Sequence, residues 1–93
     1  MPQLTLNRIR DLVRSLNYAV SIHAAEELDD DNLTILDLES VFFTGQIVER
    51  QRDRRTREVK TVVRGRTLDG FEAEAIVKLG HTGTLFVITA YAV

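Results

Sequence analysis

The chain has 93 residues, 44% of them hydrophobic, which suits one small globular domain and excludes a disordered chain. It contains no cysteine, which excludes disulfides, thiolate nucleophiles and cysteine-ligated metal sites. The formal net charge of −2 is small. No apolar run reaches the roughly 20 residues that span a bilayer, and Met1 to Leu4 does not begin like a signal peptide. We therefore expect a cytoplasmic protein without a membrane partner.

The N-terminal part of the chain predicts helices and one short strand. Apolar residues recur with a helical period over about 5–16, which predicts an amphipathic helix. Residues 18–22 are rich in aromatic and β-branched side chains and form a candidate short strand. Ser21 is placed to cap a short helix over 23–30.

A third helix and a series of strands follow. Thr34 and Asp37 resemble a capping box at the start of a helix that Gly45 ends. Asp69 followed by Gly70 is a strong hairpin signal. Patterns typical of strands occur at 47–52, 57–67, 71–79 and 85–93.

These elements predict a single α+β domain over residues 1–93. Because helices come first and strands last, we expect the N-terminal helices to pack on one face of a four-stranded antiparallel sheet. The last strand, 85–93, is apolar on both of its faces, which is typical of a strand inside a sheet.

The charge reverses its sign in the middle of the chain. Residues 23–40 contain no Lys or Arg but many acids, namely Glu26, Glu27, Asp29, Asp30, Asp31, Asp37 and Glu39. Residues 41–67 carry a surplus of bases, namely Arg50, Arg52, Arg54, Arg55, Arg57, Lys60, Arg64 and Arg66. Local fields of this kind steer charged partners even when the net charge is small. The basic stretch suits RNA or an acidic protein, and the acidic stretch suits a basic protein.

The strand periodicity groups several of these bases. Arg50 and Arg52 share one face of their strand, and Lys60, Arg64 and Arg66 share one face of the next, so one sheet face is expected to be strongly basic and to bind RNA phosphates. The alternative is an ordinary solvated face on which cross-strand acids neutralise the arginines. The strand acids available for this are Glu49, Glu58, Glu72 and Glu74.

Two further side chains are candidates for chemistry. His23 lies at a helix start, and an imidazole exchanges its proton near neutral pH, but it is also a suitable residue for packing at a strand–helix junction. His23 with Glu26 or Glu27 has the spacing of two metal ligands on one helical face, yet no third ligand is evident, so we expect no metal site. Tyr91 suits base stacking or proton donation, or simple packing at a strand end. His81 belongs to a predicted turn.

Several short segments, taken together, resemble a small bacterial family filed as domain of unknown function number 4258. The matching segments are Ser21-Ile22-His23-Ala24, Leu33-Thr34-Ile35-Leu36-Asp37-Leu38-Glu39, Thr44-Gly45-Gln46-Ile47-Val48-Glu49, Arg64-Gly65-Arg66-Thr67-Leu68-Asp69-Gly70 and Val87-Ile88-Thr89-Ala90-Tyr91. The resemblance covers about residues 18–92.

That family is similar to the RelE, ParE and BrnT toxins of bacterial toxin–antitoxin pairs. The resemblance implies a RelE/ParE toxin-like fold with helices on one face of a small antiparallel sheet. Several of the related toxins are metal-independent ribonucleases, whereas the ParE branch acts on gyrase. The family pattern places arginines after the His-Ala pair, as His-Ala-x-x-Arg-Met-x-x-Arg, but Glu27 and Asp31 occupy those positions here.

Two hypotheses follow. In the first, the chain is an endoribonuclease of a toxin–antitoxin pair that uses no metal and no cofactor. His23 is then the general base or acid and Tyr91 a stacking or proton-donating group. Arg64 and Arg66 would clamp the phosphate. In the second, the chain is a non-catalytic module whose acidic and basic faces dock a protein, such as an antitoxin, or a second copy in a homodimer. Convergence of the four residues in a cleft would favour the first hypothesis.

Overall fold

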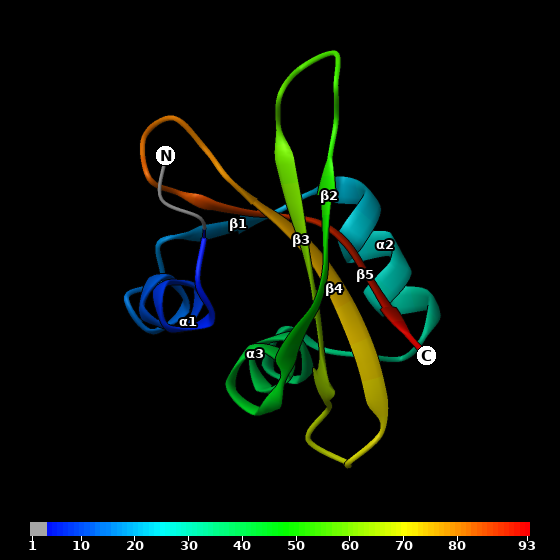
Figure 1. Ribbon diagram of the computed structural model, residues 1–93. Helices are drawn as coiled ribbons and strands as arrows, with labels where there is room; N and C mark the ends of the chain where they lie inside the picture. Colours follow the sequence, from blue (N-terminus) through cyan, green and yellow to red (C-terminus); the bar gives the residue numbers. More distant parts are fainter. Residues whose placement is uncertain (1–3) are drawn as a thin grey trace.

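The computed structural model describes residues 4–93, which form three helices and five strands. The helices are α1 (Leu6–Arg14), α2 (Ile22–Asp30) and α3 (Ile35–Thr44). The strands are β1 (Tyr18–Val20), β2 (Gln46–Arg52), β3 (Val59–Arg66), β4 (Glu72–Leu79) and β5 (Leu85–Ala92). The predicted α+β class is confirmed, and all three helices contribute to one core on the same face of the sheet (Figure 1).

The sheet differs from the one that the sequence predicts. It has five strands in the order β1-β5-β4-β3-β2, and β1 runs parallel to β5, with Tyr18 opposite Leu85 and Val20 opposite Val87. The prediction of a four-stranded antiparallel sheet is therefore wrong. The candidate strand at 18–22 forms as β1 and pairs with β5, the last strand of the chain. It is an edge strand, and its parallel pairing makes the sheet mixed.

The central position predicted for the last strand is confirmed. β5 pairs with β4 along its whole length and with β1 at residues 85–87. Leu85, Val87 and Ala90 are buried beneath the helices. On the opposite face Phe86 remains 39% exposed, so β5 contributes mainly one face to the core.

Helix α3 lies close to β3 because glycine occupies both its C-cap, Gly45, and the facing strand position, Gly65. A Cβ atom built on Gly65 would overlap the carbonyl oxygen of Val41, and one on Gly45 would overlap the same atom. Only glycine permits this separation. The close contact brings Val41 and Phe42 against Val63, and all three are buried.

The predicted helix starts are confirmed in atomic detail. The Ser21 hydroxyl accepts a hydrogen bond from the Ala24 amide at 3.0 Å. Thr34 and Asp37 form a complete capping box at the start of α3. At its other end, α3 has no basic residue in its last turn, and Arg10 of α1 donates to the carbonyl oxygens of Phe42 and Gly45 at 2.9 and 3.1 Å.

Beyond the end of β1, side chains of α2 and its caps form hydrogen bonds with the backbone of β5. The Ser21 hydroxyl donates to the carbonyl oxygen of Ile88 at 2.9 Å. Further along the helix the carboxylate of Glu27 accepts from the amide of Ala90 at 3.2 Å, and at its C-cap that of Asp31 accepts from the amide of Ala92 at 2.8 Å. Side chains spaced four residues apart on the helix thus satisfy every second amide of the strand. Both acids have a structural role.

Candidate functional site

The bases of β2 and β3 lie on two different faces of the sheet. Arg50 pairs with Thr61, which is buried beneath the helices, whereas Lys60 and Arg64 belong to the opposite, outer face. The expectation of one strongly basic sheet face is therefore wrong. The register of β2 shifts between Ile47 and Glu49, and such a β-bulge moves all later side chains of the strand to the other face.

The turn between β2 and β3 is ordered by Asp53. Its carboxylate accepts from the backbone amides of Arg55 at 2.8 Å and Thr56 at 3.4 Å. The amide of Asp53 donates to the carbonyl oxygen of Glu58 at 2.9 Å, and its carbonyl oxygen accepts from the amide of Arg57 at 2.8 Å. Arg57 adopts a left-handed backbone with φ of 61°. An aspartate that organises its own turn in this way presents the intervening side chains to solvent.

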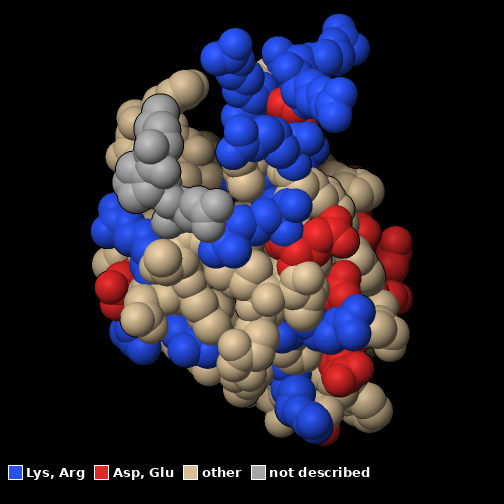
Figure 2. Space-filling view, viewed as in Figure 1, with Lys and Arg blue, Asp and Glu red and all other residues tan. Residues whose placement is uncertain are grey.

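The basic tip, defined as residues 52–60, carries an excess of cationic side chains. They are Arg52, Arg54, Arg55, Arg57 and Lys60. Within residues 4–93, no hydrogen bond or ion pair engages any of these five side chains, and the four arginines are exposed. Figure 2 shows the tip as a blue projection above the body of the molecule.

The acids of the basic tip are engaged. Asp53 is occupied by the turn amides. Glu58 accepts from the Lys78 ammonium of β4 at 3.1 Å, which also ties the hairpin to the sheet. Arg50, at the base of the hairpin, donates to the carbonyl oxygen of Leu4 at 3.0 Å. The tip is thus held at its base and positively charged at its end.

A second cluster lies on the outer sheet face, where three adjacent strands bring together Arg64, Glu74 and Tyr91. Arg64 is opposite Glu74, and Glu74 is opposite Tyr91. The Arg64 guanidinium donates two hydrogen bonds to one carboxylate oxygen of Glu74, through Nε at 2.7 Å and through a terminal nitrogen. The Tyr91 hydroxyl donates to the other oxygen at 2.7 Å. Glu74 is only 8% exposed and forms the centre of the cluster.

The contacts shift the pKa of all three groups in the directions that favour the protonation states seen in the cluster. The hydrogen bond from Tyr91, followed by that from Arg64, outweighs burial and holds the pKa of Glu74 below its usual value. The bond to Glu74 raises the pKa of Arg64 and, together with burial, that of Tyr91. Near neutral pH the cluster therefore consists of a guanidinium, a carboxylate and a phenol.

The predicted catalytic residues converge only in part. Arg64 and Tyr91 meet at Glu74, but among the described residues no hydrogen bond or ion pair joins the Arg66 side chain to that cluster. His23 lies at the start of α2, where its Nε2 is 3.2 Å from the Glu27 carboxylate and its side chain is 67% exposed. Glu27 interacts electrostatically with Tyr91, so one residue, Glu27, separates His23 from the cluster.

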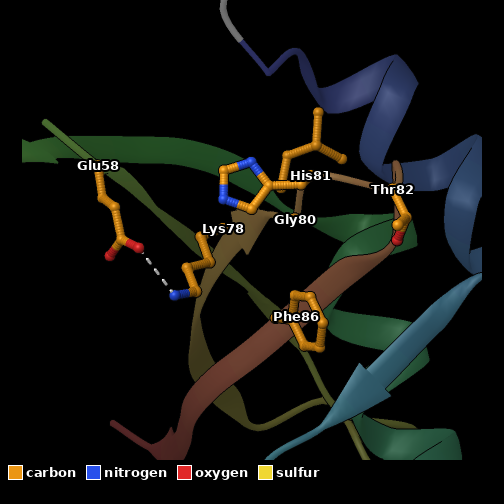
Figure 3. A pocket seen from close by; sticks show the side chains of 7 residues that line it. Glu58, Lys78, Gly80, His81, Thr82 and Phe86 are labelled. Atoms are coloured by element: carbon orange, nitrogen blue, oxygen red, sulfur yellow. Dashed lines mark hydrogen bonds and ion pairs between the residues drawn. The ribbon is translucent and has the colours of Figure 1, made fainter. Parts of the chain in front are cut away.

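A shallow hollow of about 350 Å³ lies elsewhere, between the hairpin and the end of β4 (Figure 3). Its lining consists of Glu58, Lys78, Leu79, Gly80, His81, Thr82 and Phe86. His81 lies in the turn that the sequence predicts. The hollow includes none of the predicted catalytic residues. Within residues 4–93 no three His, Asp or Glu side chains are placed to share a metal ion.

Sequence reasoning did not identify Glu74 and the turn arginines Arg54, Arg55 and Arg57 as parts of a site. Glu74 was expected to neutralise arginines, and its pairing with Arg64 confirms that alternative for one side chain. Arg54 and Arg55 belong to the polar run 53–56 that joins the predicted strands, and Arg57 was expected at the start of the strand over 57–67, although β3 begins at Val59. The signal that identifies them is Asp53 at the first position of that run, because an aspartate there predicts an ordered turn.

The comparisons with known proteins agree with the resemblance in part. The model of one family, described as Domain of unknown function (DUF4258), matches residues 20–92. No curated protein and no solved structure matches the chain. Across the described residues, every helix is too short or too polar to cross a bilayer.

Proposed function

The chain belongs to the DUF4258 family, and we propose that it is a non-catalytic module that binds the phosphate backbone of nucleic acid through the basic tip. The observation that carries the proposal is the charge state of the tip: its arginines are exposed without a protein partner, whereas its acids are engaged. Such side chains release counterions when they contact phosphates, which is the main source of affinity in nonspecific binding. RNA and DNA share this chemistry.

The first prediction tests the tip with a charge-matched pair of variants. Arg54→Gln with Arg55→Gln should weaken binding of fluorescein-labelled 20-nucleotide RNA or DNA and reduce the slope of log affinity against log salt by about two, roughly one for each lost phosphate contact. Fluorescence anisotropy over a salt series measures both quantities. Arg8→Gln with Arg14→Gln removes the same charge from exposed positions on α1 and should leave the slope unchanged. Equal losses in the two variants would reject the tip as the binding site.

Arg57 separates charge from folding in the same assay. Its left-handed backbone costs an ordinary residue about 1 kcal/mol that glycine does not bear. Arg57→Gly should therefore raise the melting temperature by a few degrees while weakening nucleic-acid binding. Weaker binding by a more stable protein cannot be attributed to partial unfolding.

A second candidate function, an endoribonuclease of a toxin–antitoxin pair, is favoured by one observation. Arg64 and Tyr91 both contact Glu74 on the outer face, and His23 approaches this cluster through Glu27. Against this candidate, Arg64 is already paired with Glu74, whose negative charge would repel a phosphate. The similarity to the RelE, ParE and BrnT toxins supports the candidate without deciding it.

This second candidate makes its own prediction. If the protein cleaves RNA, His23→Ala should lower the cleavage rate roughly 100-fold or more, as loss of one acid–base group does. Tyr91→Phe should also impair cleavage if the phenol donates a proton. The measurement maps the ends of a long unstructured RNA after incubation with purified protein. We expect no protein-dependent cuts, because Glu74 occupies the phosphate clamp; cuts that disappear in the His23 variant would favour the ribonuclease instead.

A further inference from the structure

The basic tip belongs to a two-stranded ribbon that extends past the rest of the sheet. β2 pairs with β3 as far as Arg52 opposite Val59, whereas β3 pairs with β4 only from Thr61 onward. Residues 51–60 therefore have no backbone pairing to a third strand, and this segment contacts β4 through the Glu58–Lys78 ion pair. Figure 1 shows this hairpin projecting alone at the top of the molecule. At roughly 3.3 Å per residue, Gln51 to Arg54 reaches on the order of 10 Å outward.

The ribbon carries a cationic side chain on each of its faces as well as two at its end, and on the Lys60 face Glu58 is paired with Lys78. Arg52 shares the helix-side face with Val59, and Lys60 shares the opposite face with Gln51. Arg54 and Arg55 form the end of the turn. The bulge near Ile47 produces this arrangement, because without the register shift Arg52 would lie on the same face as Lys60. A surface that met one line of phosphates would need bases on one face only.

The major groove of B-form DNA has phosphates along both of its walls, and the distance between the walls matches the width of a two-stranded ribbon. It is about 12 Å wide and 8.5 Å deep and admits a two-stranded β-ribbon. The major groove of an A-form RNA duplex is too narrow for protein side chains to read. A single strand offers one line of phosphates and no walls.

We infer that the β2–β3 ribbon enters the major groove of duplex DNA, with Arg52 and Lys60 reaching phosphates on opposite walls and Arg54 and Arg55 directed at the groove floor. This inference rests on the proposed nucleic-acid binding and specifies its ligand. Arginines at the groove floor meet the acceptor atoms of guanine, which would add a moderate preference for G·C pairs.

The test compares four ligands of one 20-nucleotide sequence at one salt concentration: single-stranded DNA, duplex DNA, single-stranded RNA and duplex RNA. Duplex DNA should bind roughly tenfold more tightly than duplex RNA, because only its groove accepts the ribbon. Methyl green, which occupies the major groove, should displace the protein from duplex DNA. Netropsin, which occupies the minor groove, should not.

Variants of the two ribbon faces complete the test. Arg52→Gln and Lys60→Gln should each weaken duplex binding and lower its salt slope by about one, and their effects should add. Arg8→Gln is the matched control on α1, and thermal melting establishes that each variant is folded. Tighter binding to single strands, equal binding to both duplexes, displacement by netropsin, or an effect of only one face would overturn the inference while leaving the proposed function in place. Absence of binding to all four ligands would overturn both.

Discussion

Glu74 is the residue whose surroundings determine what the outer sheet face can do. It is nearly buried and accepts hydrogen bonds from both Arg64 and Tyr91. Its negative charge neutralises the positive charge of the Arg64 guanidinium. A buried carboxylate with two partners stabilises the positions of both. The cluster is thus better suited to holding β3, β4 and β5 in register than to binding an anion.

Replacing this carboxylate is predicted to destabilise the fold. Glu74→Gln leaves Arg64 without its charged partner and should lower the free energy of unfolding by about 1–3 kcal/mol. Urea denaturation measures the change. Glu72→Gln, at an exposed position two residues away on the same strand, is the control and should stay within roughly 0.5 kcal/mol of the parent. Equal effects at the two positions would show that the cluster contributes nothing.

The same residue links stability to pH. Because folding lowers the pKa of Glu74 from its ordinary value of 4.5, its contribution is present above that pH and is lost as the pH falls through the lower, folded-state pKa. The melting temperature of the parent should therefore fall more steeply between about pH 5 and pH 3 than that of Glu74→Gln. Parallel curves for the two proteins would contradict the assignment.

Among the elements, α2 is noteworthy because it substitutes for a strand. Its Glu27 and Asp31 carboxylates occupy the amides of Ala90 and Ala92 that a neighbouring strand would otherwise bind. Arginines at these two positions could not make the same bonds, because a guanidinium carries no acceptor. The two acids therefore satisfy the edge of β5.

Truncating these acids should loosen that edge. Glu27→Ala with Asp31→Ala is predicted to cost about 1 kcal/mol for each lost bond and to speed hydrogen exchange at the Ala90 and Ala92 amides. Glu27→Gln with Asp31→Asn keeps an acceptor oxygen at each position and should restore much of the protection. Glu26→Ala with Asp30→Ala, on the exposed side of the helix, is the control. Unchanged exchange in the truncated variant would refute the capping role.

Local sequence signals predicted the individual helices and turns better than the pairing and register of the strands. The caps at Ser21 and Thr34 and the turn at Asp69 and Gly70 involve neighbours in sequence, so short-range chemistry was sufficient. The pairing of Tyr18 with Leu85 joins distant segments, and a three-residue strand carries no sign of its partner. The bulge in β2 was likewise invisible, although that one residue decides which face Arg50 and Arg52 occupy.

At the scale of the molecule, opposite charges lie in different places. The basic tip projects from one end, and acidic atoms gather on the side of α2 (Figure 2). A tip on one copy therefore complements the helix of another. Such contacts act through local fields rather than through the net charge of −2.

Self-association is accordingly predicted to depend on salt. Light scattering should give a higher mass at low salt than at about 0.5 M, where screening acts within a few ångströms. Arg54→Glu with Arg55→Glu should abolish the difference, and duplex DNA should compete with it. A monomer at low salt would remove the predicted homodimer, while an oligomer that persists at high salt would point to an apolar interface.

The two edge strands of the sheet differ in how readily each can pair with a strand of another molecule. One is formed by the three residues of β1 and is continued by α2, while the other is the full length of β2, which is exposed except at Ile47. Among the described residues, strand addition therefore has one long border available, that of β2, against three residues of β1 on the other side. Two molecules joined through β2 would occupy both long borders, so we expect polymerisation by this route to stop at a pair. A fibre needs two reactive borders on every subunit, which the short β1 edge and the docked α2 disfavour.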